Sequence, residues 1–201
     1  MNTNKQQKLF RLHCVALIMA FGMLMPACGG GGSSNNPVTN PLTAAFTPTD
    51  PNPAADTISM AGATAGANVS VSIEVTDIND FFGAGFSVTY DPATVNFTGF
   101  DATGSLLENH GGQTYYDVEE PNQGTVIVAA TIQDAGQPAG MDVVGTQTLI
   151  KLNFQATTTT ASNPIAFAGP QDVQVCAVQG QACNEVSGNL TWSGGSIRAS
   201  R

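Results

Sequence analysis

Few side chains in this sequence are placed to do chemistry, and the first candidates are two adjacent carboxylates. Glu119 and Glu120 follow one another in a segment that alternates like a β-strand, and successive side chains of a strand point to opposite faces. The pair therefore cannot flank one glycosidic bond, as the paired carboxylates of glycosidases do. His110 lies in the loop-like sequence Asn-His-Gly-Gly, with no cysteine or G-x-S-x-G serine to activate. These patterns predict a chain that is not an enzyme.

A short oxygen-rich turn is the one candidate for a metal. Asp77, Asn79 and Asp80 offer carboxylate and amide oxygens, which are calcium ligands, but the twelve-residue EF-hand pattern is missing. Asp and Asn side chains also bond to nearby backbone in turns. An Asx-type turn between strands is the favoured interpretation, with calcium as the alternative and no other cofactor expected.

The N-terminus is typical of an export signal. Three basic residues within the first eleven precede an apolar run over 12–25. This run is shorter than the roughly 20 residues that a membrane-spanning helix needs. Residues 1–27 are therefore predicted to be a cleavable signal peptide.

The signal ends in a small residue directly before a cysteine, Ala27-Cys28. This resembles the lipobox of bacterial lipoproteins, in which the cysteine is lipidated and becomes the first residue. The resemblance implies several acyl chains on Cys28, and two or more chains give stable anchoring. Because Gly29 and not Asp follows the cysteine, it also implies an outer-membrane or cell-surface location.

Two cysteines, Cys176 and Cys183, remain after the signal and the lipid site. In an oxidising compartment they are predicted to form a disulfide that closes a local loop around Gly180. Metal binding fails on ligand count, because His110 is the one histidine after Cys28.

Composition separates a tether from a domain. Residues 28–56 begin with glycine and serine and then carry five prolines, which predicts a flexible linker with an r.m.s. span of roughly 30 Å. Residues 57–201 are one domain's worth of sequence with strand-like alternation, for example over 69–76, and no sustained helical period. Short strands separated by turn residues predict an all-β sandwich or barrel.

One motif within this domain is specific. The segment 83–92, Gly-Ala-Gly-Phe-Ser-Val-Thr-Tyr-Asp-Pro, followed by Val95 and Phe97, resembles the signature of cohesin modules. The likeness extends over about Ile58 to Arg198. It implies a nine-stranded jelly-roll β-sandwich that binds partner proteins and catalyses no reaction.

The same motif predicts a binding face. Alternation sends Phe86, Val88 and Tyr90 inward, so the side chains between them must face solvent. These candidate binding residues are Gly83, Gly85, Ser87 and Thr89. In cohesins this side is the recognition sheet, where many cellulosomal members carry Asn or Asp on the strand and this chain carries glycines. A small, uncharged surface predicts binding that depends little on salt.

Charge limits the partners. Fifteen acids follow Cys28, and the basic residues after it are Lys151, Arg198 and Arg201, which excludes electrostatic binding of nucleic acid or anionic lipid. Membrane contact is expected through the lipid alone. The predicted function is recruitment of a protein partner, dockerin-like or an envelope component. The alternative is a carbohydrate-binding or adhesion module, for which one ring of the neighbouring Tyr115 and Tyr116 would face out.

Overall fold

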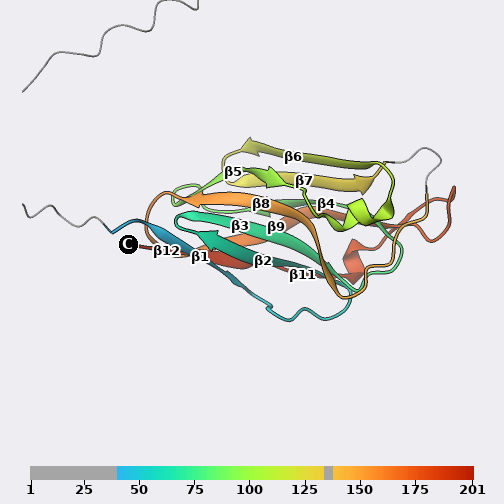
Figure 1. Cartoon of the computed structure of the whole chain (residues 1–201), viewed down its shortest axis with the longest axis horizontal. Coiled ribbons are helices and arrows are strands. Elements are labelled where there is room, and N and C mark those ends of the chain that lie inside the picture. The colour runs from blue at the N-terminus through green and yellow to red at the C-terminus, as the bar shows by residue number, and fades with distance from the viewer. Residues whose placement is uncertain (1–39, 134–137) are drawn as a thin grey trace, which may run out of the picture. The chain divides into compact units, whose positions relative to one another are not determined.

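The alternating segments form the strands of two facing β-sheets in a computed structural model, which describes residues 40–133 and 138–201 (Figure 1). The predicted signal peptide, Cys28 and residues 28–39 of the predicted tether lie outside the described residues. The strands are β1 (Thr43–Pro48), β2 (Thr57–Ala65), β3 (Asn68–Thr76), β4 (Phe81–Thr89), β5 (Val95–Asp101), β6 (Thr114–Asn122), β7 (Thr125–Ile132), β8 (Thr146–Ala156), β9 (Thr160–Val175), β10 (Asn184–Glu185), β11 (Thr191–Ser193) and β12 (Gly195–Ser200). Two 3-10 turns, η1 (Leu106–His110) and η2 (Ser187–Asn189), are the helical elements of this part of the chain.

The strand order confirms the predicted all-β sandwich. One sheet runs β1-β12-β9-β4-β7-β6, with β10 paired to β9, and the other runs β11-β2-β3-β8-β5. Over the described ranges there are twelve strands against the nine expected. The difference is the edge strand β1 and the two short strands β10 and β11. None of the described helices is long and apolar enough to cross a membrane.

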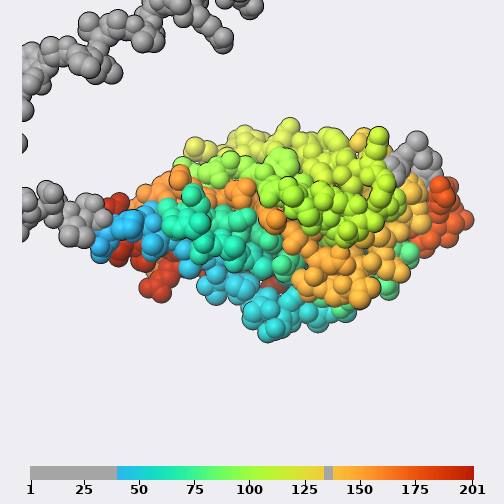
Figure 2. All heavy atoms as spheres, viewed as in Figure 1, coloured from blue at the N-terminus to red at the C-terminus, as the bar shows by residue number. Residues whose placement is uncertain are grey.

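The core lies between the sheets and follows the period-two alternation. Val69, Val71, Ile73 and Val75 of β3 are buried and belong to the same hydrophobic core cluster as Phe86 of β4. Tyr90, directly after β4, meets Phe154 of β8 edge to face, with ring centroids 5.4 Å apart. On the side shown in Figure 2, η1 lies against β8.

Strand β1 corrects the predicted tether. It pairs with β12 along its whole length, from Thr43 opposite Ser200 to Pro48 opposite Gly195. Its Phe46 ring lies against Gly62 and Gly195, where an added Cβ would fall 2.7 Å and 2.2 Å from the nearest ring atoms. The prediction of a flexible linker throughout 28–56 is therefore wrong for Thr43–Pro48, because two glycines on other strands make room for its aromatic ring.

The Tyr-Asp-Pro corner after β4 is held by a buried amide from β9. Asn163, 1% exposed, accepts a hydrogen bond from the Asp91 backbone N–H at 2.9 Å. Its Nδ2 donates to the Asp91 carbonyl oxygen at 2.8 Å and to Thr94 Oγ1 at 2.7 Å. All the polar groups of this side chain are thereby used to fix the corner against β9.

Tyr90 fastens the same corner on its other side. Its hydroxyl donates to a carboxylate oxygen of Glu120 on β6 and accepts from the Phe97 backbone N–H at 3.2 Å. Burial, and then this bond to Glu120, raise the pKa of the Tyr90 hydroxyl above its usual value. Through these hydrogen bonds Tyr90 connects the end of β4 to β6 and β5.

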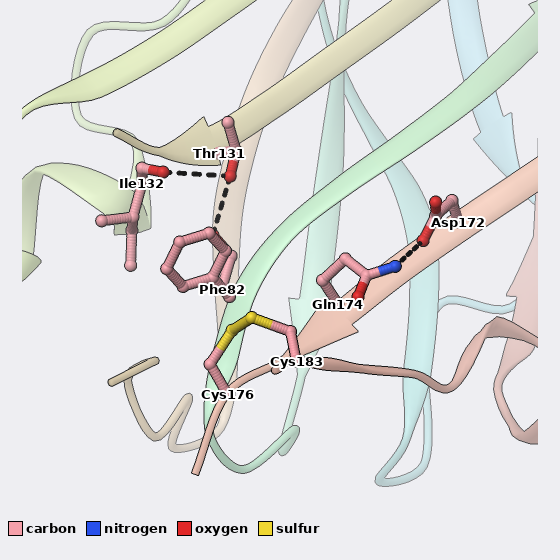
Figure 3. The surroundings of a disulfide bond; sticks show 7 residues. All are labelled: Phe82, Thr131, Ile132, Asp172, Gln174, Cys176 and Cys183. Carbon is pink, nitrogen blue, oxygen red and sulfur yellow. Dashed lines mark hydrogen bonds between the residues drawn. A yellow bond between two sulfur atoms is a disulfide. The ribbon is translucent and has the colours of Figure 1, made fainter. Parts of the chain in front are cut away.

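The predicted disulfide is present between Cys176 and Cys183, with Cα atoms 4.4 Å apart (Figure 3). The Cys176 N–H donates to the Asp80 carbonyl oxygen at 2.9 Å, and its carbonyl oxygen accepts from Gly140 N at 2.7 Å. The crosslink thus closes the loop after β9 at the point where β9 is tied to the start of β4.

The oxygen-rich turn lies between β3 and β4. Asp77 Oδ1 accepts a hydrogen bond from Gly145 N at 2.6 Å, and Asp80 N donates to Asp142 Oδ1 at 3.1 Å. Asp77 and Asp80 have positive φ values of 47° and 55°, a conformation that Asp tolerates better than most residues. The carboxylates of Asp77 and Asp142 therefore hold this turn against the segment before β8. Nowhere in the described ranges do three His, Cys, Asp or Glu side chains gather as metal ligands would.

Candidate recognition face

Strand β4 has the alternation that its sequence predicts. Phe86, Val88 and Tyr90 belong to the core, with exposed fractions of 2%, 0% and 8%. The intervening positions lie on the other side of the sheet, but two of them are covered by their neighbours: Gly83 is buried and Ser87 is 8% exposed. Gly85 and Thr89 are half-exposed.

Strand register assembles the neighbours of these positions into one surface. In β7, Thr131, Ala129, Ile127 and Thr125 stand opposite the four β4 positions. We use the term outer face for the outward residues of four adjacent strands. They are Tyr115, Asp117 and Glu119 of β6; Thr125, Ile127, Ala129 and Thr131 of β7; Gly83, Gly85, Ser87 and Thr89 of β4; and Ala166, Ala168, Asp172 and Gln174 of β9.

The centre of the outer face is apolar. Ile127, its largest aliphatic side chain, is 46% exposed. It lies between Glu119 on one neighbouring strand and Ser87 on the other. Ala129 lies two residues further along β7, and Ala168 of β9 lies beyond Ser87 in the same row. Although β7 is almost continuously apolar, the face that carries Ile127 is open to solvent.

Carboxylates border this apolar centre. Asp117 and Glu119 on β6 and Asp172 on β9 are all exposed, and Asp172 stands opposite Gly85. No lysine, arginine or histidine occurs in β4, β6, β7 or β9. The prediction of an uncharged binding surface is therefore wrong. It considered the strand β4 alone, whereas the charges come from strands that the fold places on either side of it.

A hollow of about 180 Å³ opens in the outer face beside Asp172. Its floor is β4 and β7 backbone at Gly83, Gly85 and Ala129, and Thr131 and Gln174 line it further. Figure 3 shows Gln174 and Asp172 along β9, with the amide Nε2 of Gln174 bonded to the Asp172 carboxylate.

The two glycines differ in what surrounds them. A Cβ on Gly83 would lie 2.7 Å from the Ala130 carbonyl oxygen and from Thr131, whereas a Cβ on Gly85 would meet nothing closer than the Val128 carbonyl oxygen at 3.9 Å. Gly83 is therefore required by the packing of the sheet. Gly85 leaves space that the protein itself does not use.

Tyr115 and Tyr116 face opposite sides of β6, as the alternation of a strand predicts. Tyr115 is 43% exposed and stands opposite Thr131 on the outer face. Tyr116 packs against the core, and its buried hydroxyl has no hydrogen-bond partner. Tyr116 is thus wrongly placed among the candidate binding residues, because β6 is a strand that turns its second tyrosine inward. A single exposed ring is thin support for a carbohydrate platform.

A family model described as Cohesin domain matches residues 56–188 of this chain. No curated protein matches the chain.

Solved structures share the fold at low sequence identity. The seventh ScaB type I cohesin from Pseudobacteroides cellulosolvens is 15% identical, with a TM-score of 0.50 over 65% of this chain and 80% of that chain. The second type II cohesin module from the cellulosomal adaptor ScaA scaffoldin of Acetivibrio cellulolyticus is 10% identical, with a TM-score of 0.50 over 76% and 91%. The third cohesin ScaC of that organism, solved in complex with the ScaB dockerin, is 19% identical, with a TM-score of 0.49 over 65% and 88%.

Proposed function

Because the chain belongs to the cohesin domain family, whose members are non-catalytic modules that bind dockerins, we propose that it recruits a dockerin-like protein through its outer face. The observation that carries this proposal is Ile127, a large aliphatic side chain left 46% exposed in the middle of a sheet. Exposed apolar patches with polar borders are typical of protein interfaces. The carboxylates around Ile127 provide such a border.

The test is to block the outer face and measure binding of natural dockerin modules displayed on phage. Thr89→Arg places a long charged side chain on the outer face. We expect this variant to bind the captured dockerin module at least tenfold more weakly than the unmodified protein does. Ser70→Arg is the matched control, because Ser70 lies on the other sheet, opposite Asn153, and should leave binding unchanged. Circular dichroism verifies that both variants fold.

Two results would contradict the proposal. One is a dockerin module that still binds Thr89→Arg as it binds the unmodified protein. The other is the absence of binding to every dockerin module in the panel.

Lipid anchoring is a second proposal, supported by the resemblance of Ala27-Cys28 to a lipobox. The lipid on Cys28 would hold the domain at the outer membrane or cell surface. Since β1 begins at Thr43, the predicted tether is shortened to residues 28–42. A coil of this length has an r.m.s. span of roughly 20 Å.

Mass spectrometry of protein extracted from membranes checks this proposal. The expected product begins at Cys28 and carries acyl chains, and Cys28→Ser should yield an unacylated protein that is no longer extracted with the membrane. A mature N-terminus at another residue, or retention of Met1, would show that the lipobox interpretation is wrong.

A further inference from the structure

We infer that the hollow beside Asp172 is a socket for one lysine or arginine side chain of the bound partner. Its aliphatic stem would lie over Gly85 and its cationic end beside the Asp172 carboxylate. This inference rests on the proposed function and specifies the chemistry of the partner that the outer face selects.

The shape of the hollow suits an inserted side chain. Gly85 has no atom above it, and the nearest atom to an added Cβ is the Val128 carbonyl oxygen at 3.9 Å. Thr131, Asp172 and Gln174 also line the hollow, which has a volume of about 180 Å³. A flat partner surface would leave this space empty, at the cost of the dispersion contacts that a filled space provides.

The charge around the hollow selects the kind of side chain. Asp172 lines it, and register places Asp117, Ala129, Gly85 and Asp172 in one row across four strands. No basic residue occurs in these strands, and the ion pair between Lys151 and Asp101 lies on the other sheet. These four strands thus give Asp172 the neutral Gln174 amide and no cation, so a cationic side chain of the partner would complement it.

Other side chains fit this site less well. A purely apolar side chain would remove water from the Asp172 carboxylate and leave it only the neutral Gln174 amide as a partner, which costs part of the desolvation of a charge. An acidic side chain would be repelled by Asp172 and Asp117. Lysine and arginine combine an apolar stem with a charged end. The stem can pack over Gly85 while the charged end pairs with the Asp172 carboxylate.

The experiment selects binders from a phage-displayed library of dockerin modules with randomised surface positions. We expect modules selected on the unmodified protein to share one basic position. Gly85→Leu fills the socket, and Asp172→Asn removes its charge. Each variant should bind these selected modules with at least tenfold lower affinity than the unmodified protein does. Glu74→Gln is the matched control, because it removes a carboxylate from the other sheet, opposite Thr148, and its effect should stay within threefold.

A double-mutant cycle links the two partners. Changing the basic position of the module to methionine should weaken binding to the unmodified protein tenfold or more, and should cause little further loss on Asp172→Asn. If Gly85→Leu does not fold, the cycle with Asp172→Asn decides the question, because Asp172 is an exposed side chain.

The outcomes separate this inference from the proposed function. Modules that are lost on Thr89→Arg but tolerate both Gly85→Leu and Asp172→Asn would overturn the socket while supporting the outer face as the binding site. Modules that tolerate Thr89→Arg as well would overturn both.

Discussion

Replacing Asn163 with alanine is expected to lower the free energy of unfolding by about 3 kcal/mol, because three part-buried hydrogen bonds of one side chain are lost together. The Asp91 N–H, the Asp91 carbonyl oxygen and Thr94 Oγ1 all bond to this one side chain. Alanine leaves the Asp91 N–H without its acceptor at a site where Asn163 is 1% exposed. Urea denaturation followed by circular dichroism measures the loss.

Asn153→Ala is the control for this variant. Asn153 is also an asparagine in a long strand, but its half-exposed side chain lies on the outside of the other sheet. We expect a change within about 0.5 kcal/mol, as for most surface substitutions. If Asn163→Ala were no more destabilising than Asn153→Ala, the Tyr-Asp-Pro corner would not depend on the buried amide.

Changing Ile127 to aspartate is expected to weaken binding of a captured dockerin module at least 30-fold, which corresponds to about 2 kcal/mol. The substitution removes the apolar centre of the outer face and adds a charge beside Glu119, which is directly opposite on β6. The free energy of unfolding of the isolated domain should fall by only about 1 kcal/mol, because Ile127 is already 46% exposed while aspartate is a poor strand former and would stand opposite Glu119. Isothermal titration calorimetry gives the affinity, and a urea titration gives the stability.

Val144→Asp makes the same kind of change elsewhere. Val144 is 79% exposed and precedes β8, outside the outer face. This variant should bind like the unmodified protein. Normal binding by Ile127→Asp would mean that Ile127 is not the centre of the interface.

The part of the site that could be predicted from sequence is the part that one strand determines alone. The alternation of Phe86, Val88 and Tyr90 fixes which side of β4 faces the core, and burial confirms it. The cysteine pair was equally predictable, since Cys176 and Cys183 are close in the chain and joined in the structure.

The rest depends on pairings between distant segments. Gly85 and Asp172 are far apart in sequence, and only the antiparallel pairing of β4 with β9 makes them neighbours. The role of Asn163 likewise depends on a contact with Asp91, 72 residues away. No local pattern encodes either contact. The acidic border of the outer face and the hydrogen bonds of Asn163 to the Tyr-Asp-Pro corner could therefore not be predicted from alternation or composition.

The pairing of β1 with β12 has a consequence for recombinant work on this domain. The family match spans residues 56–188, so a fragment cut to those limits would lack both strands, and one begun at Thr57 would lack β1. Without β1, six residues of β12 that are now paired would become an open sheet edge. Such edges recruit strands from other molecules. A fragment trimmed to the recognisable sequence would therefore be prone to aggregate, and soluble preparations should begin before Thr43.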